Sequence, residues 1–199
     1  RRQDPDIRLL CKANVRRLDA EVIRDSMLHV AGSLDMKLGG PDIDHAQGAT
    51  VPRRSLYFRH AYEKQMLLLT TFDAAAPSEC YRRSASVVPQ QALALANGPL
   101  AIEQSRILAG KLSGASESSD AFIRAAFRAV LCRDCSSDEL TACSEFLTSQ
   151  TNLLAQPDKL QAFDTKAHVR RAPASDPALR ARENLVHVLM NHNDFVTVR

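Results

Sequence analysis

The chain has 199 residues, of which 45% are hydrophobic and 25% are charged, with a formal net charge of +3. This composition is ordinary for one globular domain or two small ones, and it argues against a disordered chain, a collagen-like repeat or a disulfide scaffold. No apolar run approaches the roughly 20 residues of a membrane-spanning helix, and the stretch from Met66 to Leu69 stops at Thr70, so we expect no membrane span. Aromatic residues total 5% and Trp is absent, which argues against nucleic-acid binding because there is little for bases to stack on.

The first part of the chain is predicted as helix, loop and one short strand. Apolar residues at helical spacing predict two helices, or one bent helix, over residues 6–35, with Asp19 as an N-cap between them. A Gly-Gly-Pro sequence interrupts that pattern and predicts a loop over 39–52. Residues 54–60 are the best strand candidate and residues 87–88 the obvious partner, so we expect at most an accessory two-stranded sheet.

The rest of the chain is predicted as helices joined by polar links. The signals include Pro89 in a first turn, Gly98 at a helix end and the capping box Ser136-x-x-Glu139. The predicted helices cover 62–72, 89–97, about 99–112, about 122–132, a stretch opened at 136 and about 176–191, with a long loop over 150–175. The sequence therefore predicts a mainly α fold, a single helical domain over residues 1–199 with a sub-domain hinge at 113–119.

Five cysteines leave at least one thiol unpaired within the chain. Cys132 and Cys135 have the C-x-x-C spacing of a metal or redox site, but a zinc site needs four ligands and no second pair of the right spacing follows. A redox motif of the thioredoxin type would follow a strand, whereas a helical pattern precedes this one. We therefore expect free thiols at a corner between two helices, and no metal.

The sequence contains no Gly-rich phosphate loop, no G-x-S-x-G elbow and no H-E-x-x-H zinc motif. Asp42, Asp44 and His45 lie close together after a glycine-rich turn, where they could meet a divalent cation or form a solvated polar turn. The polar turn is the better interpretation, because no further ligand lies at a fixed spacing. Catalysis by a nucleophile is unsupported at the level of motifs, although triads assemble only in space.

The most distinctive candidates are charged residues embedded among apolar neighbours. Buried charges have to be paired, because an unpaired buried charge costs several kcal/mol. One interpretation is therefore a network of arginines and carboxylates that ties the helices together. The alternative is an anion pocket formed by whichever arginine has no carboxylate partner. The set consists of Arg17, Arg24, Asp25, Arg54, Asp73 and Arg83.

Six segments of the sequence, in order, resemble a known family. They are Arg16-Arg17-Leu18-Asp19-Ala20-Glu21-Val22-Ile23-Arg24-Asp25-Ser26, Gly39-Gly40-Pro41, Arg53-Arg54-Ser55-Leu56-Tyr57, Phe72-Asp73-Ala74, Pro89-Gln90-Gln91-Ala92-Leu93-Ala94-Leu95-Ala96-Asn97 and Asn191-His192-Asn193-Asp194-Phe195. The chain is similar along nearly its whole length to the planctomycete cytochrome-associated C-terminal domain, which has no assigned reaction. It departs from the family pattern at Leu131-Cys132-Arg133, where members usually have Leu-Gly-Arg and then a turn containing proline.

The resemblance implies a context rather than an activity. Members of that family are secreted or periplasmic multidomain proteins, often with an upstream cytochrome c-like domain that holds haem, so we expect no cofactor in this chain itself. The chain opens without an initiator methionine or a leader, which predicts a piece of a longer protein.

Two functions follow as hypotheses. The first is a non-catalytic helical interaction module that docks the upstream domain and an anionic extracellular polymer. The second is part of an enzyme, redox or polysaccharide-directed, whose active site the upstream domain completes. An open cleft lined by the charged set would favour the enzyme, and a closed ion-pair network would favour the module.

Overall fold

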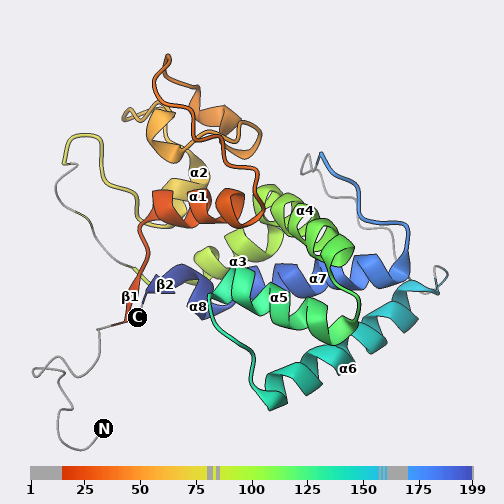
Figure 1. The fold of residues 1–199 in the computed structure, drawn as a ribbon. Helices are drawn as coiled ribbons and strands as arrows, with labels where there is room; N and C mark the ends of the chain where they lie inside the picture. Colours follow the sequence, from red (N-terminus) through yellow and green to blue (C-terminus); the bar gives the residue numbers. More distant parts are fainter. Residues whose placement is uncertain are drawn as a thin grey trace, which may run out of the picture.

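The computed structural model describes residues 15–79, 83, 86–156, 158, 160 and 170–198 (Figure 1). These residues form eight α-helices, short 3-10 helices and one two-stranded sheet, which confirms the mainly α prediction. The α-helices are α1 (Ala20–Val30), α2 (Leu67–Thr71), α3 (Pro89–Asn97), α4 (Pro99–Ala115), α5 (Ser119–Leu131), α6 (Ser137–Leu154), α7 (Pro177–Met190) and α8 (Asn193–Val196). The short elements are η1 (His45–Ala49), η2 (Ser55–Tyr57), β1 (Arg16–Arg17) and β2 (Thr197–Val198).

Helix α7 lies at the centre of the helical layer and packs along α4 and α6, with α5 against its side (Figure 1). Its buried residues, which include Ala181, Leu185 and Leu189, repeat every four positions and so form one apolar stripe. Helix α5 contributes Phe122 and Ala126 to the same core. Helix α1 packs against α2 and α4 and extends this core toward the N-terminal part of the fold.

Local capping signals place two helix starts where the sequence predicts them. Asp176 accepts hydrogen bonds from the first turn of α7, and Pro177 occupies its first position. Ser136 and Glu139 form both hydrogen bonds of the capping box at the start of α6. Glu139 also pairs with Arg133 at 2.7 Å, and this hydrogen bond, together with the Ser136 N–H, lowers the pKa of Glu139 to about 2.

The predicted strand over 54–60 is wrong. Ser55 donates its backbone N–H to the carboxylate of Asp25 rather than to a strand, and the chain turns into η2 there. Residues 87–88, predicted as its partner, lead directly into α3 and belong to no strand. The sheet instead pairs β1 with β2 in antiparallel register, with Arg16 opposite Val198, so it joins residues from opposite ends of the chain.

Two helix boundaries also differ from the prediction. Over 62–72 only the five residues of α2 are helical, because a turn in which Ala61 and Lys64 exchange both backbone hydrogen bonds precedes it. Helix α6 continues to Leu154, into the stretch predicted as loop.

Helix α1 begins directly after Asp19, although the Asp19 side chain makes no capping bond. The helix predicted over 6–14 lies outside the described residues, and the hinge at 113–119 stays a prediction, with residues 113–115 forming the last turn of α4.

Cys132 ends α5 in the left-handed region, with φ 53°. Side chains with a Cβ adopt this conformation at a cost of about 1 kcal/mol relative to glycine, which favours glycine at such helix ends. The glycine that the resembling family places here therefore has a physical reason, and Cys132 replaces it at an exposed position.

We expect Cys132→Gly to raise the free energy of unfolding by about 0.5 to 1 kcal/mol, because it relieves this backbone strain. Urea denaturation under reducing conditions measures the change. Cys132→Ala keeps the strain and removes the thiol, so it should leave stability nearly unchanged. An equal rise in stability in both variants would show that removal of the thiol, and not relief of the backbone, is responsible.

Candidate functional site

Arg24 projects from α1 into the loop that carries η1 and η2, and it is fully buried. Its guanidinium donates to the carbonyl oxygens of Gly48 (3.0 and 2.8 Å), Val51 (2.8 Å) and Arg53 (2.8 Å). The ring of Phe58 lies 4.6 Å from the guanidinium carbon. Burial lowers the pKa of Arg24, but an arginine stays charged at any physiological pH. One side chain therefore holds a loop of irregular backbone against a helix.

The Asp25 carboxylate lies 3.2 Å from Nη1 of Arg24 and forms an ion pair with it. The same carboxylate also binds the first residue of η2. Its carboxylate accepts the backbone N–H of Ser55 at 2.9 Å and the Ser55 hydroxyl at 2.7 Å. The Ser55 hydroxyl is in turn within 3.3 Å of the Arg24 guanidinium. The three side chains form a closed network in which each polar group is used by the fold.

Arg17 and Asp73 form a second closed network between β1 and the end of α2. The Arg17 guanidinium donates to the carboxylate of Asp73 at 2.6 Å and to the carbonyl oxygens of Phe72 and Ser86. Asp73 also accepts the backbone N–H of Ser86 at 2.7 Å and its hydroxyl at 2.8 Å. Gln91 of α3 donates to the carbonyl oxygen of Ser86 and so connects α3 to the network.

Asp73 occupies a position where glycine would be less strained. Its φ is 58°, and the backbone bonds from Asp73 to Thr70 and from Ala74 to Leu69 form a Schellman end to α2. Burial raises the pKa of Asp73, but the hydrogen bonds from Arg17 and Ser86 outweigh it and leave that pKa below its ordinary value. The carboxylate at this left-handed position is therefore stabilised by its partners rather than by its backbone.

The remaining two residues of the predicted charged set have different surroundings. Arg83 forms a bidentate ion pair with Glu21 of α1, at 2.8 and 3.3 Å, which lies at the surface. Arg54 forms no ion pair or hydrogen bond through its side chain with any described residue. The structure thus places five of the six residues in three separate ion pairs, the third of them with Glu21 at the surface, and gives Arg54 no ion pair with a described residue.

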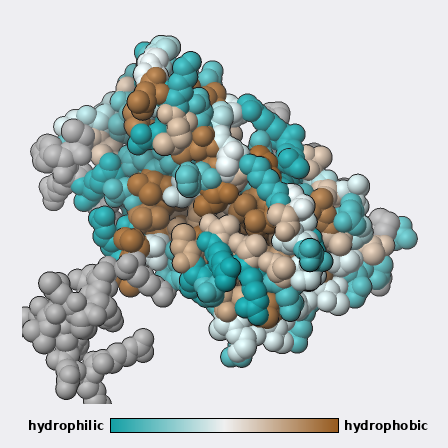
Figure 2. Space-filling view, viewed as in Figure 1, coloured by the Kyte–Doolittle hydropathy of each residue, from teal (hydrophilic) through white to brown (hydrophobic). Residues whose placement is uncertain are grey.

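Arg54 lines a groove that we call the ribbon groove, with a volume of about 930 Å³, between α1, the end of α5 and the β1–β2 ribbon. Its apolar residues include Val22, Leu56 and Met36, which are 44, 58 and 59% exposed. Arg133 lies at one edge, where it pairs with Glu139 and with Asp194 of α8. Figure 2 shows apolar residues gathered on this face around α1 and the hollow beside it.

The other candidates from the sequence have local structural contacts. Asp44 caps η1 by accepting the N–H of Ala46, and Asp42 pairs with the exposed Arg59. Cys132 is exposed and Cys135 is buried. Among the described residues, no group of three or more His, Cys, Asp or Glu side chains could hold a metal ion. None of the described helices is long and apolar enough to cross a membrane.

A family model, PSD1, described as a protein of unknown function (DUF1553), matches residues 1–147. The chain belongs to this family. No curated protein and no solved structure matches the chain significantly. The match to PSD1 includes both internal networks and the Arg54 side of the ribbon groove, whereas α7, α8 and β2 follow it in the chain.

Sequence motifs do not reveal the neutral partners of the charged set. Ser55, Ser86 and Gln91 complete the two networks. A serine or glutamine outside a periodic apolar pattern does not indicate that its side chain is buried. Ser55 directly follows Arg54, and Gln91 follows Pro89, so both lie inside segments that carry the family resemblance. Their place in these segments is the one feature of the sequence that points to Ser55 and Gln91.

Proposed function

We propose that this member of the PSD1 family is a non-catalytic helical interaction module that docks an upstream domain of its own protein through the ribbon groove. The observation that carries the proposal is the contrast between the two networks and the groove. Arg17, Arg24, Asp25 and Asp73 are bound to partners within the chain, so they hold the scaffold. The groove beside them keeps apolar side chains exposed to solvent.

The ribbon groove has the composition of a docking surface. Val22 and Leu56 line it as exposed apolar side chains, and the ion-paired Arg133 and Asp194 line it as well. A mixture of exposed apolar and ion-paired side chains is typical of protein interfaces, and contiguous apolar patches on a protein surface mark interaction sites. Arg54 adds one cation with no partner among the described residues, which suits an acidic group on the partner.

The upstream domain is the preferred partner because of where the groove lies. Leu18, which directly follows β1, lines the groove, so the chain that enters β1 arrives beside it. A domain joined to the chain before β1 would be held at a high effective concentration beside the groove. Docking would then be an intramolecular event that needs little affinity of its own.

The wider context of the proposal rests on the resemblance described above. It includes planctomycete origin, a secreted or periplasmic location and an upstream cytochrome c-like domain with haem. An anionic extracellular polymer is a weaker proposal, because Arg54 is the one arginine of the predicted set without a carboxylate partner among the described residues. Arg54 is also the one residue of that set that favours the alternative of a shared active site.

Hydroxyl-radical footprinting of the full-length protein and of the 199-residue chain tests the docking proposal. We expect Met36, Val22 and Leu56 to be oxidised several-fold more slowly in the full-length protein, because the upstream domain covers them. Leu153 on α6 is the control, since it is 43% exposed and lies outside the groove. In full-length Leu56→Glu, the rapid oxidation of Met36 should return, because a charge at the centre of the interface opposes docking.

Equal oxidation of Met36 in both forms would contradict docking in the ribbon groove. The enzyme alternative predicts a different pattern. If the full-length protein turns over a substrate, and if Arg54→Ala abolishes turnover without a change in footprint or unfolding, the groove is part of an active site and the non-catalytic proposal is wrong.

A further inference from the structure

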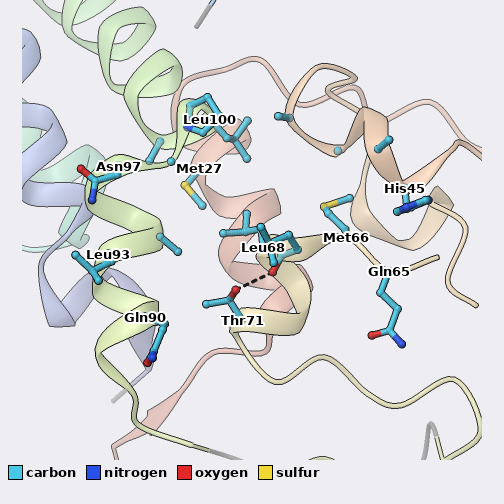
Figure 3. Close-up of a pocket in the computed structure, with 18 residues that line it drawn as sticks. Met27, His45, Gln65, Met66, Leu68, Thr71, Gln90, Leu93, Asn97 and Leu100 are labelled. Atoms are coloured by element: carbon cyan, nitrogen blue, oxygen red, sulfur yellow. Dashed lines mark hydrogen bonds between the residues drawn. The ribbon is translucent and has the colours of Figure 1, made fainter. Parts of the chain in front are cut away.

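A second pocket, distinct from the ribbon groove, lies between α1, η1, α2 and α3 and has a volume of about 770 Å³ (Figure 3). Its floor is formed by Met27 of α1 with Leu100 and Ala101 of α4, which are at most 6% exposed. Leu67 and Leu93 lie at its mouth and are 80 and 57% exposed. Buried apolar side chains therefore form the floor of the pocket, and exposed apolar side chains surround its opening.

The polar groups of this pocket surround its apolar centre. In Figure 3, Met27, Met66 and Leu68 lie near one another in the middle, whereas the Gln90 and Asn97 side chains lie farther out, on α3. The amides of Gln90 and Asn97 form no hydrogen bond with any described residue, so they are free to bind a ligand. All lining residues belong to the described part of the chain, and none of them is Asp, Glu, Lys or Arg.

One wall of the pocket is fixed by the Arg24 network. Met66 lies directly on Gly48, since a Cβ at Gly48 would be 2.4 Å from the Met66 Cε. The carbonyl oxygen of the same glycine accepts two hydrogen bonds from Arg24. The position of this wall is thus set before any ligand arrives, which reduces the entropy lost on binding. Methionine side chains at the centre can adjust to ligands of different shape.

We propose that this pocket binds an uncharged small molecule with an apolar body and a hydrogen-bonding group at one end. The volume lies within the range of about 300 to 1,000 Å³ that is typical of small-molecule sites. The body occupies the centre at Met27 and Met66, and the polar end meets an amide of Gln90 or Asn97. A charged body would lose its hydration without meeting a carboxylate, lysine or arginine of the lining, which opposes the binding of ions. The proposal does not depend on docking in the ribbon groove, because different residues line the two.

Titration with Nile red, an uncharged fluorescent dye, tests the site. We expect saturable binding of one dye per chain, displaced by decanol. Decanoate and decyltrimethylammonium have the same chain with a negative or a positive head, and each should displace the dye at least about ten-fold less effectively than decanol.

Two variants that fill the pocket from opposite walls locate the binding. Ala46→Trp extends from η1 and Ala94→Trp from α3, and each should weaken Nile red binding at least about ten-fold. Ala92→Trp is the matched control, because Ala92 is an exposed residue of α3 outside the lining, and it should bind as the unmodified chain does. Ala46 is itself exposed, so its replacement should fold even if Ala94→Trp does not. Circular dichroism verifies the fold of each variant.

Three results would overturn the proposal. The first is no saturable binding of Nile red to the folded chain. The second is equal displacement by decanol and by both charged analogues, which would remove the chemical selectivity. The third is unchanged binding by a folded Ala46→Trp variant, which would place the dye elsewhere. Protection of Leu93 from oxidation by the upstream domain in the full-length protein, without saturable dye binding, would identify the pocket as a protein contact instead.

Discussion

Replacing Arg24 with alanine should lower the free energy of unfolding by about 3 to 5 kcal/mol. The change leaves Asp25 without its cation and removes the donors that Gly48, Val51 and Arg53 use for their carbonyl oxygens. Breaking a buried ion pair from one side costs this much, because the remaining polar groups are buried without partners. Chemical denaturation followed by circular dichroism measures the loss.

Arg59→Ala is the matched control for this prediction. Arg59 pairs with Asp42 at 2.7 Å, but both side chains are about half exposed, so the loss should stay below about 1 kcal/mol. Arg24→Lys keeps the charge and loses the planar fork, and it should be intermediate. An Arg24→Ala protein as stable as Arg59→Ala would show that Arg24 does not hold the loop, and it would reopen the anion-pocket interpretation.

Asp73→Ala should destabilise the chain by about 2 to 4 kcal/mol, and Asp73→Gly by about 1 kcal/mol less. Both variants lose the contacts with Arg17 and Ser86, but only glycine relieves the left-handed backbone. The difference between the two variants therefore separates backbone strain from the contribution of the carboxylate. Urea denaturation at neutral pH measures both.

The same carboxylate predicts a dependence on pH. Because the pKa of Asp73 is lower in the folded chain, its contribution is fully present above the unfolded value near 3.8 and is lost as pH falls through the folded value. The stability gap between the unmodified chain and Asp73→Gly should therefore shrink below about pH 4. A gap that persists unchanged at pH 2 would show that the ionised carboxylate is not the stabilising group.

These experiments can separate the proposed role of the ribbon groove from that of the pocket at Met27. Leu56→Glu acts in the ribbon groove, whereas Ala46→Trp acts in the pocket of Met27, and the two hollows share no lining residue. Arg24 contributes to both sites indirectly, since it holds Gly48 behind the pocket and Arg53 beside the groove residue Arg54. Loss of Arg24 should thus impair both functions through the fold, which is why neither test uses it.

Local signals in the sequence determined most of the helices. The capping box at Ser136, the Asp176-Pro177 start and the Gly98-Pro99 junction act within one or two turns, so they were readable without knowledge of the fold. The mainly α class followed from the same signals together with the helical spacing of apolar residues. The sequence also singled out the charged residues among apolar neighbours, because burial of charge requires compensation.

Tertiary structure alone decided how those charges were used. Arg17 meets Asp73 across 56 positions and Arg24 meets the backbone of the loop 24 to 29 positions away, and no spacing rule predicts such contacts. The same long-range bonds made η2 out of a segment with strand composition, since Asp25 accepts the N–H of Ser55 that a strand partner would have needed. They also left Arg54 without a carboxylate partner among the described residues, because long-range packing, and not the identity of neighbours in sequence, determines which charged groups come within reach of one another.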